Sequence, residues 1–255
     1  MTEASGRHTE LCGATADRIE VRGRDLVRDL IGKLSFTEMF LFHLLGKDAT
    51  PLQAALTDAV LVAIMEHGLV PSAIAARLTL LGAPESLQGA VAAGLLGVGD
   101  HFAGTASRCA EVLDDIVAAP AGERMARALA TVRAFRAARK ALPGFGHPTH
   151  RSGDPRVPRL LEIARAHGAR GHYIEALSIL EGALAEVLGR TLPTNVSAAI
   201  AVVLREAQIP TEAMRGIVLT ARCAGLAGHL LEEMRAPAAE QMWHAAQDAV
   251  PYRAP

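Results

Sequence analysis

Aromatic residues and asparagine are scarce in this chain. Phe, Trp and Tyr make up 4% of its 255 residues, although half of the chain is apolar. The apolar residues are mostly Leu and Ala, which favour packed helices over sheets and can bury a substantial core. Because Asn195 is the only asparagine, turns built on asparagine are excluded elsewhere, and Gly and Pro have to separate the elements.

Cysteine and long apolar runs are also lacking. Cys12, Cys109 and Cys223 are scattered without a CxxC pair, so we expect reduced thiols in a cytoplasmic protein, and no metal. The first residues do not follow the charged-then-apolar pattern of a signal peptide. No apolar run reaches the roughly 18 to 20 residues that span a bilayer, so no membrane partner is expected.

An excess of charge of one sign is absent too. The formal net charge is −1 and no run of basic residues occurs, which leaves no basis for nucleic-acid binding. The length allows one large domain or two small ones.

Capping signals predict a succession of helices. Residues 35–38 fit a capping box that opens a helix to about Leu45, with Gly46 as its end. Thr50 and the following proline predict a second helix to about Met65. Further helices are expected from starts at 71–72, 83–85 and 122–123, from apolar periodicity around Ile163, Leu177 and Ala199, and from a start at 210–212 that opens an apolar helix to about Glu233.

The predicted fold class is therefore all-α, with at most a short β-hairpin at residues 18–23. Three parts are expected along the chain. Residues 1–16 form a flexible N-terminal arm, residues 17–236 a helical domain, and residues 237–255 a C-terminal tail, whose end at Tyr252 and Arg253 is expected to fray.

Residues 143–156 (PGFGHPTHRSGDPR) are the strongest functional signal. The segment holds three glycines, three prolines, two histidines and two arginines between helical patterns. Glycine lets a backbone approach a ligand closely, and His and Arg on a loop held by a rigid scaffold are typical of a binding or catalytic site. The alternative is a Pro/Gly-rich connector with incidental charge.

Three other positions carry chemistry, each with a structural alternative. His67 ends an apolar helix, where it either faces a cleft or interacts favourably with the helix C-terminus. The glycines of residues 97–104 either admit a ligand or allow two helices to cross closely. Arg222 lies in the most apolar helix and needs a partner, which is either an internal ion pair or a substrate carboxylate.

Taken in order, these motifs resemble the citrate synthase superfamily: a His-Gly helix end, a glycine break, a GFGH loop with DPR, an Asn-Val turn and an Arg-bearing helix. The run 94–102 (GLLGVGDHF) is similar to the GLL-x-x-GD-x-F run of the citryl-CoA lyase branch, which includes a module of ATP-citrate lyase. Phe102 stands where citrate synthases carry the His of GPLHG. The resemblance covers roughly residues 18 to 235, with a smaller CoA-side part around 105–195.

The resemblance implies cleavage of citryl-CoA to acetyl-CoA and oxaloacetate, or the reverse condensation, with coenzyme A as part of the substrate. His67 and His147 would contact the hydroxy-tricarboxylate or the oxaloacetate carbonyl. Arg156 and Arg222 would bind carboxylates, and Phe102 would lie at the substrate. The backbone of Gly144, Phe145 and Gly146 would lie against coenzyme A. No metal is implied.

The chain departs from the family at Ser197, which stands where the acid/base Asp of an N-V-D turn belongs. A serine hydroxyl is no base near neutral pH without an activating neighbour. Three interpretations remain open: a relative that binds coenzyme A and carboxylates with little or no lyase activity, an enzyme with another base such as Glu66 or His101 or another acyl-CoA substrate, or a deliberate substitution. Beside an enzyme and a non-catalytic binding protein, a generic helical interaction protein is the third class of function considered.

The resemblance also implies a homodimer or higher homo-oligomer whose site is completed by an Arg from the partner. Arg235 is the candidate for that residue. Apolar helices around 88–96 and 217–231 could form the two-fold surface, or they could be intramolecular core.

Overall fold

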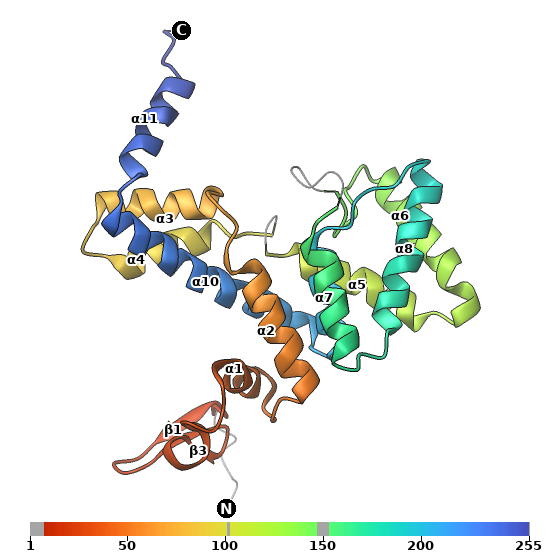
Figure 1. Ribbon diagram of the computed structural model, residues 1–255, viewed down its shortest axis with the longest axis horizontal. Coiled ribbons are helices and arrows are strands. Elements are labelled where there is room, and N and C mark those ends of the chain that lie inside the picture. The colour runs from red at the N-terminus through yellow and green to blue at the C-terminus, as the bar shows by residue number, and fades with distance from the viewer. Residues whose placement is uncertain (1–7, 101–102, 147–152, 255) are drawn as a thin grey trace, which may run out of the picture.

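Helices make up most of the chain, as predicted. The computed structural model describes residues 8–100, 103–146 and 153–254 (Figure 1). The helices are α1 (Phe36–Leu45), α2 (Pro51–Met65), α3 (Pro71–Gly82), α4 (Leu87–Leu96), α5 (Thr105–Ala118), α6 (Arg124–Ala137), α7 (Arg156–Ala166), α8 (His172–Leu188), α9 (Val196–Glu206), α10 (Thr211–Arg235) and α11 (Ala239–Ala249). A π-helical turn, Leu26–Leu30, and a 3-10 turn, Ala121–Glu123, complete the helical segments described. The all-α fold class is confirmed.

A small antiparallel sheet precedes the helices. Its strands β1 (Cys12–Ala14), β2 (Ile19–Val21) and β3 (Arg24–Asp25) pair in the order β1-β2-β3. Arg22 and Gly23 join β2 to β3 with φ angles of 50° and 76°, as a two-residue type I′ hairpin requires. The predicted hairpin therefore gains one strand, because Cys12–Ala14, within the expected arm 1–16, pairs with β2.

The predicted caps define the first two helices. Ser35 accepts from the backbone of Glu38 while the Glu38 carboxylate accepts from the backbone of Ser35, and Gly46 ends α1 with a left-handed φ of 72°. Thr50 and Gln53 repeat the capping box at the start of α2. These bonds satisfy backbone groups that a helix leaves unpaired at its ends, which is why the capping residues in the sequence predicted both helix starts.

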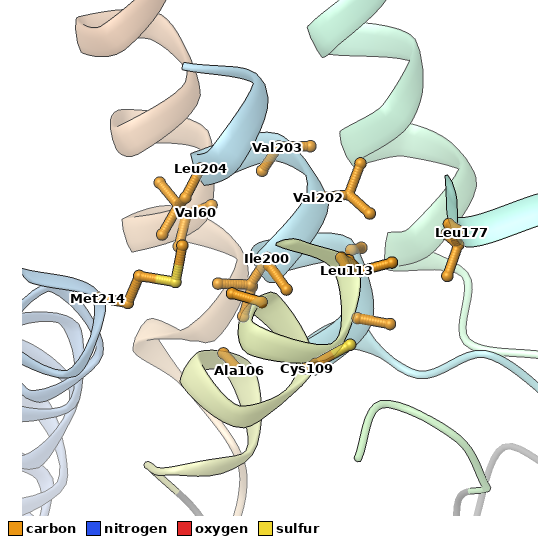
Figure 2. Packing of buried hydrophobic residues seen from close by; sticks show 14 of the residues in the cluster. Val60, Ala106, Cys109, Leu113, Leu177, Ile200, Val202, Val203, Leu204 and Met214 are labelled. Carbon is orange, nitrogen blue, oxygen red and sulfur yellow. The ribbon is translucent and has the colours of Figure 1, made fainter. Parts of the chain in front are cut away.

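The core is centred on α9. Every residue from Ala198 to Leu204 is at most 3% exposed, and a helix buried on all sides belongs to the interior of a protein. Figure 2 shows Ile200, Val203 and Leu204 of this helix beside Val60 of α2 and Leu113 of α5. The site described below lies at the N-terminal end of this buried helix.

Two groups of helices lie on either side of α2. Helices α3, α4 and α11 contact one another or the distal half of α10, whereas α5, α6 and α8 contact one another (Figure 1). Helix α11 packs on α3, so Ala239–Ala249 of the expected tail 237–255 form a helix. The division of residues 17–236 into a larger part and a smaller part around 105–195 stays a prediction.

Within the described residues, no helix combines the length and the apolar character that crossing a membrane requires.

Candidate active site

The Pro/Gly-rich loop pairs with the turn before α9. Phe145 forms a β-bridge with Thr194, Gly146 N donates to Pro193 O at 2.8 Å, and Asn195 N donates to Gly144 O at 2.9 Å. The Asn195 side chain donates to Gly146 O at 2.9 Å and accepts from Ser197 N at 3.0 Å, which caps α9. The single asparagine of the chain therefore joins the loop to the first turn of the buried helix.

Gly144 brings the loop backbone into contact with the core. Its φ is +91°, and a Cβ at this position would lie 2.8 Å from both Ala198 Cβ and Cys109 Sγ. Only glycine fits such a contact without displacing its neighbours. Burial raises the pKa of Cys109 to about 12, so this thiol stays protonated at neutral pH and serves packing.

Asp154 connects the far end of the loop to the same turn. Its carboxylate accepts from Arg156 Nε at 2.9 Å, from Arg156 Nη2 at 2.8 Å and from Val196 N at 3.1 Å, and its side chain is fully buried. Burial by itself would raise the pKa of Asp154, but the hydrogen bonds and charge of Arg156 and the Val196 amide hold that pKa below its usual value. This fork fixes the guanidinium of Arg156 at the pocket edge.

Arg222 is a buried cation without an ionic partner among the described residues. It is 5% exposed, and its Nη1 donates to Ile64 O at 3.1 Å and to Met65 O at 2.9 Å at the end of α2. Its Nη2 is buried without a hydrogen-bond partner in the described part of the chain. Burial lowers the pKa of Arg222, although an arginine remains cationic at neutral pH. The internal ion pair that was one alternative for Arg222 is therefore not formed there.

One turn further along α10, Gly225 touches the end of α2 directly. A Cβ on Gly225 would overlap the carbonyl oxygen of Met65, so no side chain of α10 could fit between the two backbones there. A Cβ on Gly94 of α4 would lie 2.7 Å from Leu226 of α10 and 2.9 Å from Ser72 O, so these helices also cross closely. Gly94 precedes the glycine-rich run 97–104, for which both alternatives stay predictions.

The turn after α2 carries Glu66 and His67. Glu66 Oε1 accepts from the backbone of His67 at 2.8 Å, from the backbone of Gly68, and from His229 Nε2 at 3.0 Å. Gly68 has a φ of +70°, which reverses the chain before Pro71 begins α3. Burial alone would raise the pKa of Glu66, but the two amides and His229 together lower it. His67 is exposed and faces the cavity.

These elements enclose one pocket. It gathers His67, Arg156, Ser197 and Arg222, four predicted site residues that lie up to 155 positions apart in the sequence. Glu66 and Ser72 add polar groups, and the remaining walls are apolar, made of Ile64, Val70, Val98, Ala106, Val196, Ile200 and Val218. A largely apolar cleft with a few convergent polar groups is the usual form of a small-molecule site.

The charges of this pocket suit an anion. Two guanidinium groups, Arg156 and Arg222, converge on it, and Ser197 lies in the first turn of α9, where the helix dipole and free amides favour negative charge. The Ser197 hydroxyl has no hydrogen-bond partner in the described ranges. The pocket therefore provides donors and positive charge for carboxylates.

The other predicted site residues lie outside this pocket. Gly144 and Gly146 lie in the loop behind it, and Phe145 lines a second cavity with Arg136, Arg139 and Lys140. Arg235 is exposed at the last position of α10. His147, Phe102 and His101 fall outside the described residues. In the described ranges, no group of three or more His, Cys, Asp or Glu side chains has the geometry of a metal site.

Sequence reasoning missed Asp154 as the residue that orients Arg156, and it missed His229 and Arg77 behind Glu66. The Asp in DPR was a visible signal, since a carboxylate two residues before an arginine can form a fork with it. His229 is a full 163 residues from Glu66, so nothing local pairs them.

Comparisons with known proteins agree with this fold. The family described as "Citrate synthase, C-terminal domain" matches residues 10–243. The protein named "Putative citrate synthase 2" from Mycobacterium tuberculosis H37Rv is 31% identical over 185 residues, which are 70% of this chain and 47% of that protein. The citrate synthase of Synechocystis sp. PCC 6803 is 27% identical over 208 residues, 79% of this chain and 50% of the relative. The chain thus spans about half the length of the curated relatives it matches.

Solved structures extend the likeness over almost the whole chain. Citryl-CoA lyase from Hydrogenobacter thermophilus superposes with a TM-score of 0.85 at 27% identity, covering 98% of this chain and 95% of that one. An ATP citrate lyase from Methanosaeta concilii in complex with (3S)-citryl-CoA gives a TM-score of 0.78 at 19% identity over 100% of this chain and 43% of its own, which concerns the fold alone. With the family match over residues 10–243, the chain belongs to the citrate synthase family.

Proposed function

We propose that this protein is an enzyme that cleaves citryl-CoA into acetyl-CoA and oxaloacetate, or forms it from them. The observation that carries the proposal is the pocket in which His67, Arg156 and Arg222 converge, with Nη2 of Arg222 buried and unpaired among the described residues. A buried N–H without a partner costs about 1 to 3 kcal/mol. A substrate carboxylate would pair it and recover that cost.

The two arginines play different parts in this proposal. Arg156 is held by the Asp154 carboxylate, so its orientation is fixed before a ligand arrives. Arg222 has one free donor and no neutralising carboxylate within hydrogen-bond range in the described residues, so it gains most from an anionic ligand. Together they would bind carboxylates of the oxaloacetate portion.

The histidines would stabilise the oxygen on which negative charge develops. His67 faces the pocket at the end of α2, and the resemblance assigns His147 to the same substrate portion. A donor held at the developing oxyanion lowers the barrier because it need not reorganise during the reaction. The Gly144–Gly146 backbone, with Phe145, would lie along coenzyme A, and Phe102 would lie at the substrate.

Ser197 limits the rate in this scheme. The described part of the pocket contains one carboxylate, Glu66, whose lowered pKa and three hydrogen bonds to Oε1 make it a weak base. Loss of a positioned general base typically costs about 10²- to 10⁴-fold. Ser197 therefore favours a second candidate, a relative that binds coenzyme A and carboxylates with little turnover.

One experiment separates the two candidates. Release of oxaloacetate and acetyl-CoA from citryl-CoA would be measured for the native chain, for Ser197→Asp and for Ser178→Asp, an exposed serine on α8 that serves as the control. We expect Ser197→Asp alone to gain roughly 10²- to 10⁴-fold. If neither the native chain nor Ser197→Asp turns over while both bind coenzyme A, the lyase proposal is wrong and the binding relative stands.

The same proposal includes a homodimer or higher homo-oligomer. Leu96 at the end of α4 is 87% exposed and Leu231 on α10 is 48% exposed, so part of the apolar surface predicted around 88–96 and 217–231 is uncovered. Other residues of these ranges, such as Ile217 and Leu226, are intramolecular core. Arg235 of a second copy would complete the site.

A further inference from the structure

A network of buried, hydrogen-bonded polar groups joins α3 and α10 outside the pocket. Arg77 of α3 is 2% exposed, and His229 and Glu233 of α10 are 9% and 5% exposed. Arg77 donates to His229 Nδ1 from Nη2 at 2.9 Å and from Nε at 3.2 Å, and to Glu233 from Nη1 at 2.7 Å. Charged groups are rarely buried this deeply unless each is paired, and none of these three touches the pocket.

The contacts fix the tautomer of His229. A guanidinium only donates hydrogen bonds, so Nδ1 of His229 has to accept and carries no proton. The ring proton is therefore on Nε2, which points at Glu66 Oε1 at a distance of 3.0 Å. Arg77 thus turns His229 into a donor aimed at Glu66.

Glu66 connects His229 to the turn that bears His67. The oxygen that accepts from His229 also accepts from the backbone N–H groups of His67 and Gly68. The Glu66 side chain is 59% exposed, so it has solvent as an alternative partner whenever His229 does not hold it. The bond from His229 therefore keeps Glu66 on the amides that shape the turn bearing His67.

Arg77 is itself secured at a second point. Glu233 accepts from Arg77 with one carboxylate oxygen and from the backbone of Ala238 and Ala239 with the other, both at 2.8 Å, which caps the start of α11. Glu232 also pairs with Arg77. The guanidinium is therefore held from both sides, which a positioning element needs if it is to fix a group beyond it.

We propose that Arg77 and His229 are positioning residues, which hold Glu66 on the His67–Gly68 amides and so fix His67 in the pocket. The proposal rests on the function given above in assigning His67 to the substrate oxygen. A network that served stability alone would have no reason to end on the backbone of the pocket turn. The same geometry predicts that the hydrogen-bonding pattern of His229, more than its volume, is what the site requires.

Two substitutions at one position separate these roles. His229→Gln keeps an acceptor for Arg77 and a donor for Glu66 in one side chain, whereas His229→Leu keeps an apolar body and removes both. His244→Leu, at an exposed position of α11, is the matched control. Amide hydrogen exchange at His67 and Gly68, the affinity for oxaloacetate and the melting temperature would be measured for each.

We expect His229→Leu to speed exchange at both amides and to weaken oxaloacetate binding by about 10- to 100-fold, and His229→Gln to restore most of both. Where citryl-CoA is turned over, kcat should follow the same order. Unchanged exchange at the two amides in folded His229→Leu, or equal loss in His229→Gln and His229→Leu, would overturn the proposal. If His229→Leu does not fold, Glu66→Gln, which weakens the acceptor on the surface, must speed exchange at the same amides or the proposal fails. Exchange and binding need no turnover, so failure of the lyase function in the experiment on Ser197→Asp would leave this test intact.

Discussion

Replacing Arg222 by methionine tests the site most directly. The change removes a buried guanidinium and keeps a long, flexible apolar side chain in its place. Truncating one partner of a buried, hydrogen-bonded charge pair costs about 2 to 5 kcal/mol in binding. Since about 1.4 kcal/mol is a factor of ten, Arg222→Met should weaken oxaloacetate binding by roughly 30-fold to several thousand-fold.

The unliganded protein should respond much less. Methionine gives up the bonds to Ile64 O and Met65 O, but it also removes Nη2, which is buried and unpaired among the described residues. These two effects oppose each other, each of order 1 to 3 kcal/mol. We therefore expect a melting temperature within several degrees of the native value, with the ligand-induced rise in melting temperature lost.

Isothermal titration with oxaloacetate, combined with thermal melts with and without it, provides the measurement. Arg215→Met is the control, because Arg215 is on the same helix, has a side chain that is 47% exposed and pairs with Asp100 away from the pocket. Oxaloacetate affinity within about threefold of the native value in Arg222→Met would refute the assignment of this guanidinium to a carboxylate.

Three further outcomes are expected. Gly144→Ala should lower the unfolding free energy by about 2 to 5 kcal/mol, because it adds left-handed backbone strain and an overlap with Ala198 and Cys109. Gly146→Ala, at φ +80° with open space around its Cβ, should cost the strain alone. Equal losses for both variants in urea unfolding would contradict this. Folding lowers the pKa of Asp154, so its contribution to stability is complete above the unfolded pKa of about 3.9 and is lost as the pH falls through the folded pKa. The unfolding free energy of the native protein should therefore drop more steeply below about pH 4 than that of Asp154→Asn. Parallel curves of unfolding free energy against pH would contradict this. Leu96→Glu together with Leu231→Glu should reduce the mass measured by light scattering from that of an oligomer to that of a monomer, and a native protein that is already monomeric would remove the basis of the homodimer.

Local chemistry made much of the fold predictable. The starts of α1 and α2 followed from side chains that hydrogen-bond their own helix ends, so a few neighbouring residues contained the information. Helix α11 was not predicted, because its stability depends on contacts with α3 and on the cap that Glu233 provides from the end of α10. An amphipathic segment of this kind becomes a helix through its partners.

The site shows the same division. The loop 143–156 was recognised from its composition, and the convergence of His67, Arg156 and Arg222 followed from family resemblance, since their separation in the sequence exceeds any helical or strand spacing. The second set of interactions, from Arg77 through His229 to Glu66, depends on the orientations of side chains on α3, on α10 and at the end of α2. No local pattern encodes those orientations.

The contact between Gly225 and Met65 limits how α10 and the end of α2 can move. Packed helices can slide past each other by small amounts when side chains at their interface adjust, which is called shear motion. Here the backbone of α10 rests on the carbonyl at the end of α2 with no side chain of Gly225 between them, and Arg222 binds the same carbonyl. These two segments are therefore expected to move together, so that Arg222 and the turn bearing His67 keep their relative positions when a ligand binds.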